Sequence, residues 1–266
     1  MPSQARVDDH WIAHPRGRLF ARRWAPAAGG GASPLVLLHD SLGCVDLWRD
    51  FPAALSDATG RVVVAYDRLG FGRSDARPGP LPLDFIADEA CTFFPQVLQH
   101  LAIERFVALG HSVGGGMAVH CAAAAGAACE ALVTVAAQAF VEDRTVQGLR
   151  RADAHFRQAD QMERLSRYHG DKAPWVLAAW LDTWLNPAFA GWSLAATLPQ
   201  VDCPVLAIHG AEDEYGSPRH PQRIAAQATG PVRVELMPGT GHMPHREHPG
   251  QVLATVAGWL DRAGRR

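Results

Sequence analysis

Short runs of apolar residues recur along this chain and alternate with longer segments that have the periodicity of helices. The runs lie at 34–39, 61–66, 105–109, 131–136, 204–209 and 232–236, each bounded by Gly, Pro or charged residues. They are rich in Val, Leu and Ile with little polar alternation, which is typical of strands covered on both faces. The helical segments lie at 46–58, 84–101, 115–125, 218–228 and 249–263, with a bend expected at Pro95. This alternation predicts an α/β fold in which helices flank a mostly parallel, doubly wound sheet.

Two segments depart from the alternation. Residues 10–24, with Gly17 near the middle, are expected to form an antiparallel hairpin that leads into the sheet. Residues 141–200 contain no strand-like run, only helical patterns. We interpret this second segment as an inserted helical cap, so that 1–140 and 201–266 form the two parts of one core domain.

The composition limits the class of protein. At 266 residues the chain fits one α/β domain with an insertion, and its 48% hydrophobic and 20% charged residues are ordinary globular values. No apolar run approaches the ~18 residues of a membrane span, and residues 1–10 lack the apolar segment of a secretory signal. Five cysteines without C-x-x-C pairing favour reduced thiols. We therefore expect a soluble, cytoplasmic protein that does not bind membranes.

Charge and histidine spacing argue against two other classes. The net charge is −2 and the arginines are scattered among acidic residues, so nucleic-acid binding is not expected. Thirteen histidines are present, but neither H-E-x-x-H nor zinc-finger spacing occurs, so no metal site is expected. His242, His245 and His248 are close enough for adventitious binding, and we expect the last two to be surface residues. The oligomeric state stays open.

The strongest local motif is Gly110-His111-Ser112-Val113-Gly114. It follows the predicted strand 105–109 and precedes the small-residue helix 115–125, which is the setting of a nucleophile elbow. A serine on so sharp a turn projects from the edge of the sheet, and flanking glycines avoid collisions with neighbouring backbone. The motif predicts that Ser112 is a nucleophile.

Four further motifs lie after predicted strands. They are His39-Asp-Ser-Leu-Gly43, Asp67-Arg-Leu-Gly-Phe-Gly-Arg-Ser-Asp75, His209-Gly-Ala-Glu-Asp213 and Gly241-His242. With the elbow, they make nearly the whole chain resemble the α/β-hydrolase superfamily, of the capped kind that includes bacterial carboxylesterases and enol-lactonases. We expect the 67–75 motif to be a structural turn, and without G-x-G-x-x-G or G-K-[ST] it implies no nucleotide or other cofactor.

The resemblance implies a catalytic triad. A serine hydroxyl needs a base within hydrogen-bond reach and a third group that orients this base. The order Ser112, Asp213, His242 matches the hydrolase order of nucleophile, acid and base. Glu142 and Asp143 are the alternative acids, because some relatives place the acid after the preceding strand.

The resemblance also implies an oxyanion hole formed by the backbone N–H groups of Val113 and Ser41. The family usually has Gly where this chain has Asp40. We expect Asp40 to adopt a left-handed backbone conformation and its carboxylate to bond nearby backbone.

In the predicted cap, Trp180 and Trp184 share one helical face. They are candidates for an apolar substrate pocket, although aromatic residues at this spacing more often serve packing. Cys44 is expected to be a buried thiol beside the cleft.

The expected activity is hydrolysis of a small ester, lactone or related acyl substrate through an acyl-enzyme. C–C bond hydrolysis of ring-cleavage products would use the same residues and stays open. A non-hydrolytic protein of the same fold, a ligand receptor or a cofactor-free oxygenase, is the alternative of another class. Asp-nucleophile chemistry of the dehalogenase and epoxide hydrolase type is disfavoured by Ser112.

Overall fold

The computed structural model describes residues 5–28 and 30–263, and within them an eight-stranded sheet runs in the order β1-β2-β4-β3-β5-β6-β7-β8. Neighbouring strands from β4 to β8 are parallel, whereas β1 and β2 form an antiparallel hairpin that joins the sheet at β4. The mostly parallel sheet and the N-terminal hairpin were both predicted, and both are confirmed. The strands are β1 (Arg6–Ile12), β2 (Leu19–Ala25), β3 (Leu35–Leu38), β4 (Val63–Tyr66), β5 (Phe106–His111), β6 (Cys129–Val135), β7 (Val205–Gly210) and β8 (Val232–Met237).

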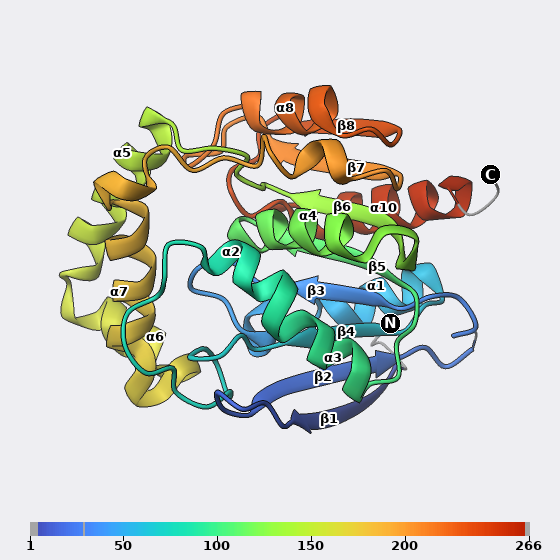
Figure 1. Cartoon of the computed structure of the whole chain (residues 1–266), viewed down its shortest axis with the longest axis horizontal. Coiled ribbons are helices and arrows are strands. Elements are labelled where there is room, and N and C mark those ends of the chain that lie inside the picture. Colours follow the sequence, from blue (N-terminus) through green and yellow to red (C-terminus); the bar gives the residue numbers. More distant parts are fainter. Residues whose placement is uncertain (1–4, 29, 264–266) are drawn as a thin grey trace.

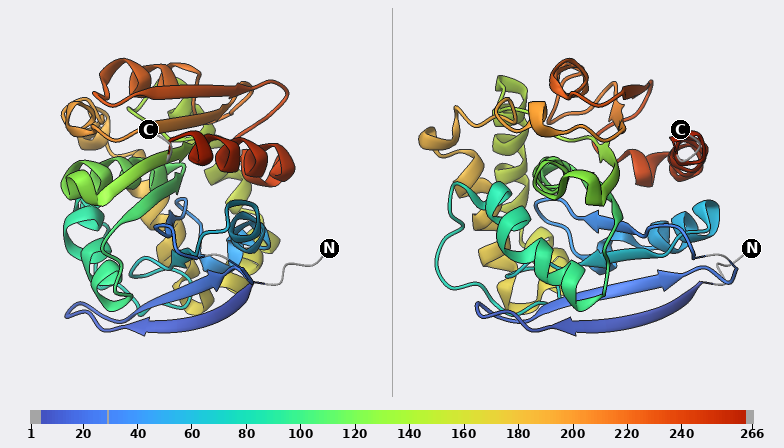
Figure 2. Two further views of the ribbon diagram at one scale, coloured as in Figure 1. Left: turned by 90° about the vertical axis from the view of Figure 1, so that its right-hand side faces the viewer. Right: turned by 45° about the vertical axis from the view of Figure 1, so that its right-hand side comes forward.

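Helices cover both faces of the sheet (Figures 1 and 2). One face carries α1 (Phe51–Thr59) and α10 (Pro249–Ala263), which pack on each other. The other face carries α2 (Phe85–Asp88), α3 (Phe94–His100), α4 (Val113–Ala125) and α8 (Arg219–Gln227). A short α9 (Pro244–Glu247) precedes α10. The shorter segments are η1 (Val45–Trp48), η2 (Glu89–Phe93, a π-helix), η3 (Gly126–Ala128), η4 (Gly170–Lys172), η5 (Pro187–Phe189) and η6 (Leu198–Gln200).

The core forms because successive strand side chains point to opposite faces. On β3, Leu35 and Leu37 join the apolar cluster under α1 and α10. Val36 and Leu38 join the cluster under α4 on the other face. All four side chains are fully buried, as expected for a parallel strand in the middle of a covered sheet.

The bounds of β3 to β8 agree with the predicted strands within one or two residues, whereas β1 begins at Arg6, four residues before the predicted hairpin. The predicted helix at 84–101 is divided into α2, η2 and α3, and Pro95 lies in the first turn of α3. Proline is tolerated there because the first N–H groups of a helix have no partner within it. The predicted helix at 46–58 begins as η1 and continues as α1.

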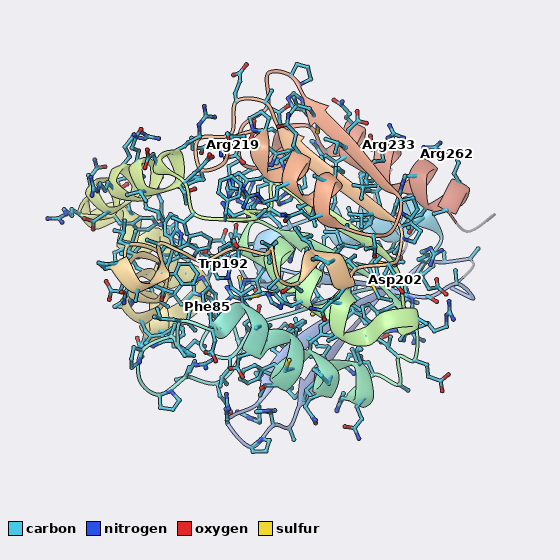
Figure 3. All side chains as sticks on the ribbon, turned by 45° about the horizontal axis from the view of Figure 1, so that its top comes forward. Phe85, Trp192, Asp202, Arg219, Arg233 and Arg262 are labelled. Atoms are coloured by element: carbon cyan, nitrogen blue, oxygen red, sulfur yellow. The ribbon has the colours of Figure 1, made fainter. Side chains whose placement is uncertain are left out.

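The predicted burial of one strand, β8, is wrong. We expected β8 to be covered on both faces, but it is the edge strand of the sheet, and Val234 and Leu236 are 38% and 43% exposed. Arg233, labelled in Figure 3, forms a 2.7 Å ion pair with Glu235 on this strand. Edge strands carry such charges because they discourage pairing with other chains.

Between β6 and β7 the chain forms three α-helices, α5 (Asp143–Phe156), α6 (Ala159–His169) and α7 (Ala173–Trp184). They stand together beyond one end of the sheet, at the left of Figure 1. Lys172 donates from Nζ to the carbonyl oxygen of Gly72 at 2.8 Å, which ties the insertion to the turn after β4. The boundaries 1–140, 141–200 and 201–266 stay a prediction.

In the described part of the chain, no helix is both long enough and apolar enough to cross a bilayer. The cytoplasmic location stays a prediction.

Candidate active site

Ser112 lies on a strained turn between β5 and α4. Its backbone angles are φ 57° and ψ −123°, a combination that non-glycine residues rarely adopt. A Cβ at Gly110 would lie 2.0 Å from the carbonyl oxygen of Gly114, and one at Gly114 would lie 2.2 Å from that of Leu38. The turn therefore needs both glycines of the motif, as a nucleophile elbow does.

The structure brings Ser112, His242 and Asp213 together from three separate loops. Nε2 of His242 lies 3.0 Å from Oγ of Ser112, and Nδ1 of His242 lies 2.8 Å from Oδ2 of Asp213. All three side chains are buried. Because the Asp213 carboxylate accepts the Nδ1 proton, Nε2 of the neutral imidazole is left as the acceptor that faces the serine hydroxyl.

Electrostatics favour this arrangement. Burial acts to lower the pKa of His242, but the negative charge and hydrogen bond of Asp213 outweigh burial, and the pKa is raised from its ordinary value. Burial acts to raise the pKa of Asp213, but interaction with His242 outweighs this, and the pKa is lowered. Asp213 is thus an anion at neutral pH, suited to stabilise a positively charged His242.

Backbone groups hold Asp213 in place. Its Oδ1 accepts hydrogen bonds from the N–H groups of Tyr215 (2.8 Å) and Gly216 (3.1 Å). Arg144 of α5 donates to the Asp213 carbonyl oxygen at 3.0 Å. The insertion is therefore attached directly to the loop that carries the candidate acid.

The alternative acids lie elsewhere. Glu142 accepts hydrogen bonds from Ser217 N–H (2.6 Å) and contacts His220 Nε2 at 3.1 Å. Asp143 is the first residue of α5 and is exposed. Neither residue is hydrogen-bonded to His242, so the geometry favours Asp213.

Asp40 differs from its prediction in two ways. The φ angle of Asp40 is not positive, so its backbone is not left-handed. Its carboxylate does not bond backbone but contacts the ring of His111, with Oδ2 3.4 Å from Nδ1. The backbone contacts of this residue run instead through its carbonyl oxygen, which accepts from Arg68 Nη2 at 2.9 Å and contacts His39 Nδ1 at 2.8 Å.

His245 also contradicts its prediction. It is buried, not at the surface, and its ring packs against Trp48 (5.0 Å between centroids) and His111 (4.6 Å). His248 is exposed, as expected. Cys44 is a buried thiol, as predicted, and lines a small cavity beside His111.

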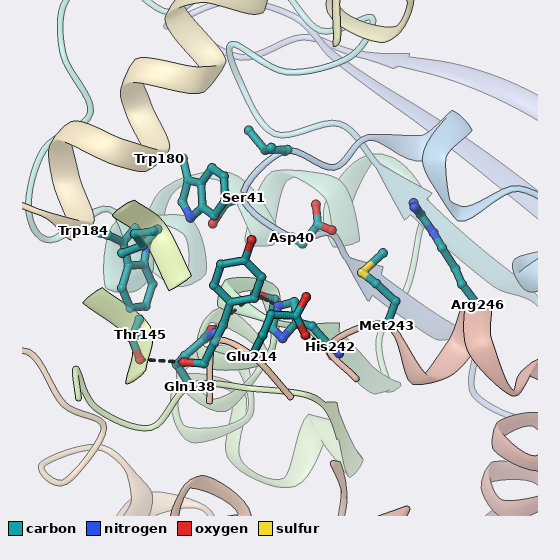
Figure 4. A pocket seen from close by; sticks show the side chains of 14 residues that line it. Asp40, Ser41, Gln138, Thr145, Trp180, Trp184, Glu214, His242, Met243 and Arg246 are labelled. Atoms are coloured by element: carbon teal, nitrogen blue, oxygen red, sulfur yellow. Dashed lines mark hydrogen bonds between the residues drawn. The ribbon is translucent and has the colours of Figure 1, made fainter. Parts of the chain in front are cut away.

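Ser112 lines a pocket of about 300 Å³, and Figure 4 shows the side chains around this pocket. Both predicted tryptophans line it: Trp180 is half-buried, whereas Trp184 is only 3% exposed and also packs against Phe189 and Trp192. The volume suits a small ligand rather than a macromolecule. The lining comprises Asp40, Ser41, Leu42, Ser112, Gln138, Thr145, Leu149, Trp180, Trp184, Glu214, Tyr215, His242, Met243 and Arg246.

Sequence reasoning missed Gln138 and Tyr215, which line the pocket and whose side chains lie next to the side chains of Ser112 and His242. Oε1 of Gln138 lies 3.3 Å from Oγ of Ser112, and the ring of Tyr215 lies 4.8 Å from that of His242. Gln138 follows β6, the strand next to the serine strand, so a polar residue at that strand end was a usable signal. Tyr215 lies two residues after Asp213, but nothing in the sequence gives its orientation.

Within residues 5–28 and 30–263, no group of three or more His, Cys, Asp or Glu side chains is arranged to hold a metal ion. His242 and His248 in particular differ in environment, one buried and one exposed.

Curated relatives match only part of the chain. A (lyso)-N-acylphosphatidylethanolamine lipase from Bos taurus is 36% identical over 86 residues, which are 32% of this chain and 25% of the lipase. The chain thus spans about a quarter of the length of that relative.

Solved structures match nearly the whole fold. Proline iminopeptidase from Mycobacterium smegmatis has a TM-score of 0.76 and 24% identity, with 96% of this chain and 98% of that chain covered. The enol-lactonase from Burkholderia xenovorans LB400 has a TM-score of 0.71 and 23% identity, with coverage of 95% and 100%. At these identities the likeness shows the fold.

The family model described as alpha/beta hydrolase fold matches residues 33–249, a span that runs from β3 to the start of α10. It agrees with the resemblance seen in the sequence motifs and supports a hydrolase. The chain belongs to the α/β-hydrolase fold family.

Proposed function

We propose that this protein is a serine hydrolase that cleaves a small ester, lactone or related acyl compound through an acyl-enzyme. The observation that carries the proposal is the continuous contact from Ser112 Oγ through His242 to Asp213, at 3.0 and 2.8 Å. Ser112 and His242 line a pocket whose size suits a small molecule, and Asp213 lies behind His242.

The reaction follows from this geometry. Ser112 Oγ attacks the acyl carbon while its proton passes to Nε2 of His242, and Asp213 stabilises the resulting imidazolium. The tetrahedral intermediate collapses as His242 gives that proton to the leaving oxygen and the bond to the acyl carbon breaks. Water, deprotonated by His242, then attacks the acyl-enzyme. The bond between Ser112 Oγ and the acyl carbon breaks as His242 returns the proton to Oγ, and the acid is released.

Two backbone groups support an oxyanion hole. Val113 is the first residue of α4, so its N–H has no carbonyl partner within the helix. Ser41 lines the same pocket from the loop after β3. Donors of this kind, fixed before the reaction, stabilise the charge that develops on the carbonyl oxygen.

The helices of 141–200 act in this proposal as a cap that selects the substrate. Trp180, Trp184 and Leu149 supply an apolar wall to the pocket, while the candidate triad comes entirely from the core. Gln138, Glu214 and Arg246 supply polar groups on the other sides. This mixture favours a small acyl compound with a compact apolar part.

A fluorophosphonate probe tests the proposal. It should label the wild-type protein on the peptide that contains Ser112, as mapped by mass spectrometry, and should leave Ser112→Ala unlabelled. A panel of p-nitrophenyl esters of graded chain length, with lactones and a ring-cleavage diketone beside them, then assigns the reaction subtype. Absence of labelling in folded wild-type protein would favour the receptor or oxygenase alternative.

A further inference from the structure

The ring of His111 connects a buried carboxylate to the backbone of the candidate base. Its Nε2 lies 2.9 Å from the carbonyl oxygen of His242, and its Nδ1 lies 3.4 Å from Oδ2 of Asp40. The His111 side chain is only 2% exposed. His111 is the first of the two variable residues of the elbow motif, so it is positioned by the same strained turn that positions Ser112.

The backbone N–H groups of Gly241, His242 and Met243 are held by carboxylates. Glu214 accepts from the N–H of His242 at 3.2 Å. Glu247 accepts from the N–H groups of Gly241 at 2.7 Å and Met243 at 2.9 Å. The carbonyl oxygen of His242 points the other way along the peptide, and its contact comes from His111.

We propose that Asp40 and His111 form a positioning pair that holds the carbonyl of His242 and so sets the position of its imidazole toward Ser112. The proposal rests on the proposed serine hydrolase function. It assigns a role to the residue that stands in place of the usual glycine in the loop after β3.

The chemistry of the partners sets the state of the pair. A carbonyl oxygen and an ionised carboxylate only accept hydrogen bonds, so His111 satisfies both when each ring nitrogen carries a proton. The pair is then an imidazolium and a carboxylate with no net charge. This matters because an isolated carboxylate beside Ser41 would oppose the negative charge that develops on the oxyanion.

The surroundings of Asp40 keep it ionised. Burial acts to raise the pKa of Asp40, but His111, His39 and Arg246 lower it, and the net shift is downward. Among the described residues, Oδ1 of Asp40, Nε1 of Trp48, Nε of Arg246 and Nδ1 of His245 have no hydrogen-bond partner, and all four residues line one cavity of about 10 Å³. Such a cavity is close to the size of one water molecule, which would join the second carboxylate oxygen to these donors.

The other titratable neighbours are histidines. His245 of α9 packs against His111 from one side, and the ring of His242 lies 5.1 Å away. Burial and the neighbouring His111 hold the pKa of His245 well below its usual range, so His245 is neutral and does not compete for Asp40.

The first test measures the protonation of His111 without any substrate. Nitrogen-15 spectra of histidine-labelled protein at pH 7, assigned with His111→Gln, should show protons on both ring nitrogens of His111. Asp40→Asn should remove one of these protons. A singly protonated, neutral His111 in the wild type would overturn the proposal.

The second test measures kinetics with p-nitrophenyl acetate. Asp40→Asn and His111→Gln should each lower kcat by about 10- to 100-fold while KM changes less than about threefold, because the base is displaced but the pocket is kept. The double variant should be no slower than His111→Gln alone, since the two residues act as one unit. The proposal would be contradicted if the kcat losses of the two single variants multiplied in the double variant, or if the kcat of Asp40→Asn stayed within about twofold of wild type.

A matched control separates this effect from general loss of charge near the site. Asp46 lies on η1, a few residues after Asp40, but is 48% exposed and pairs with Arg22 at 3.1 Å. Asp46→Asn should keep kcat within about twofold, because exposed ion pairs contribute little. If the wild type neither hydrolyses esters nor reacts with the fluorophosphonate, the proposed function fails, whereas the spectra of His111 still decide whether the pair exists.

Discussion

Nε2 of His169 contacts the carbonyl oxygen of Leu42 at 3.0 Å, so the last turn of α6 holds the loop that carries Ser41. The other ring nitrogen, Nδ1, accepts a hydrogen bond from the N–H of Gly72 at 2.9 Å. A nitrogen that accepts has no proton, so His169 is neutral and its proton lies on Nε2. The helical insertion and the candidate oxyanion loop are thereby joined by a single side chain.

This contact predicts a pH dependence of stability. Burial lowers the pKa of His169 in the folded protein, while in the unfolded chain it is close to 6.5. Below about pH 6.5 the unfolded state therefore binds more protons than the folded state, and stability is lost as the pH falls. The free energy of unfolding in urea should decrease from pH 7 to pH 5, and less steeply in His169→Gln.

His169→Gln should also cost about 1 kcal/mol at pH 7, as expected for a lost buried hydrogen bond. The matched control is His248→Gln, since His248 is exposed and should contribute within about 0.5 kcal/mol. Equal slopes for wild type and His169→Gln would mean that other buried histidines with lowered pKa, such as His39 and His220, carry the effect.

Substitution of the nucleophile or base should abolish hydrolysis. Ser112→Ala and His242→Ala should each lower kcat by about 10⁴-fold or more, because members of a triad act as a unit. Circular dichroism should show an intact fold in both variants. His248→Ala serves as the control and should keep full activity, and esterase activity that survives in purified Ser112→Ala would refute the mechanism.

The acid is tested by a comparison of two carboxylates. Asp213→Asn should lower kcat by about 10⁴-fold, because the amide favours the wrong tautomer of His242. Glu142→Gln should keep kcat but lose about 1–3 kcal/mol of stability, because Glu142 satisfies buried groups at Ser217 and His220. Steady-state kinetics and urea unfolding of both variants distinguish the two candidate acids. If Glu142→Gln were inactive and Asp213→Asn active, the acid would be the residue after β6.

Features that depend on a short stretch of neighbouring residues could be predicted from the sequence. The parallel strands are continuous apolar runs, and the elbow places two glycines, a strand and a helix within one short segment. Ser112, Asp213 and His242 each follow a strand, and parallel strands end at the same edge of the sheet, so their meeting could be expected.

The errors concern contacts between distant segments. Asp40 and His111 lie after β3 and at the end of β5, and only the adjacency of these strands in the sheet brings the carboxylate to the ring. His245 is buried because α9 folds back onto Trp48 of η1. β8 is exposed because no further strand pairs with it among the described residues, a property of strand order that its own residues do not encode.

The two tryptophans of α7 should separate substrate choice from stability. Trp184 is 3% exposed, and its ring contacts Phe189 at 5.2 Å and Trp192 at 5.6 Å. Truncation to Ala leaves a large cavity, so Trp184→Ala should cost about 3–5 kcal/mol. Urea unfolding and melting temperature measure this loss.

Trp180 is half-buried, faces the pocket and lies 5.9 Å from the ring of Tyr215, which itself packs on His242. In the proposed function, the Trp180 ring contacts the substrate equally in the ground state and in the transition state. Loss of this ring should therefore raise KM and leave kcat nearly unchanged. Trp180→Ala should therefore shift the preferred acyl length and raise KM for bulky esters, with acetate esters nearly unaffected and a smaller loss of stability than Trp184→Ala. If Trp180→Ala lost stability without any change in the chain-length profile, Trp180 would be a packing residue and the apolar wall would belong to Leu149 and Trp184.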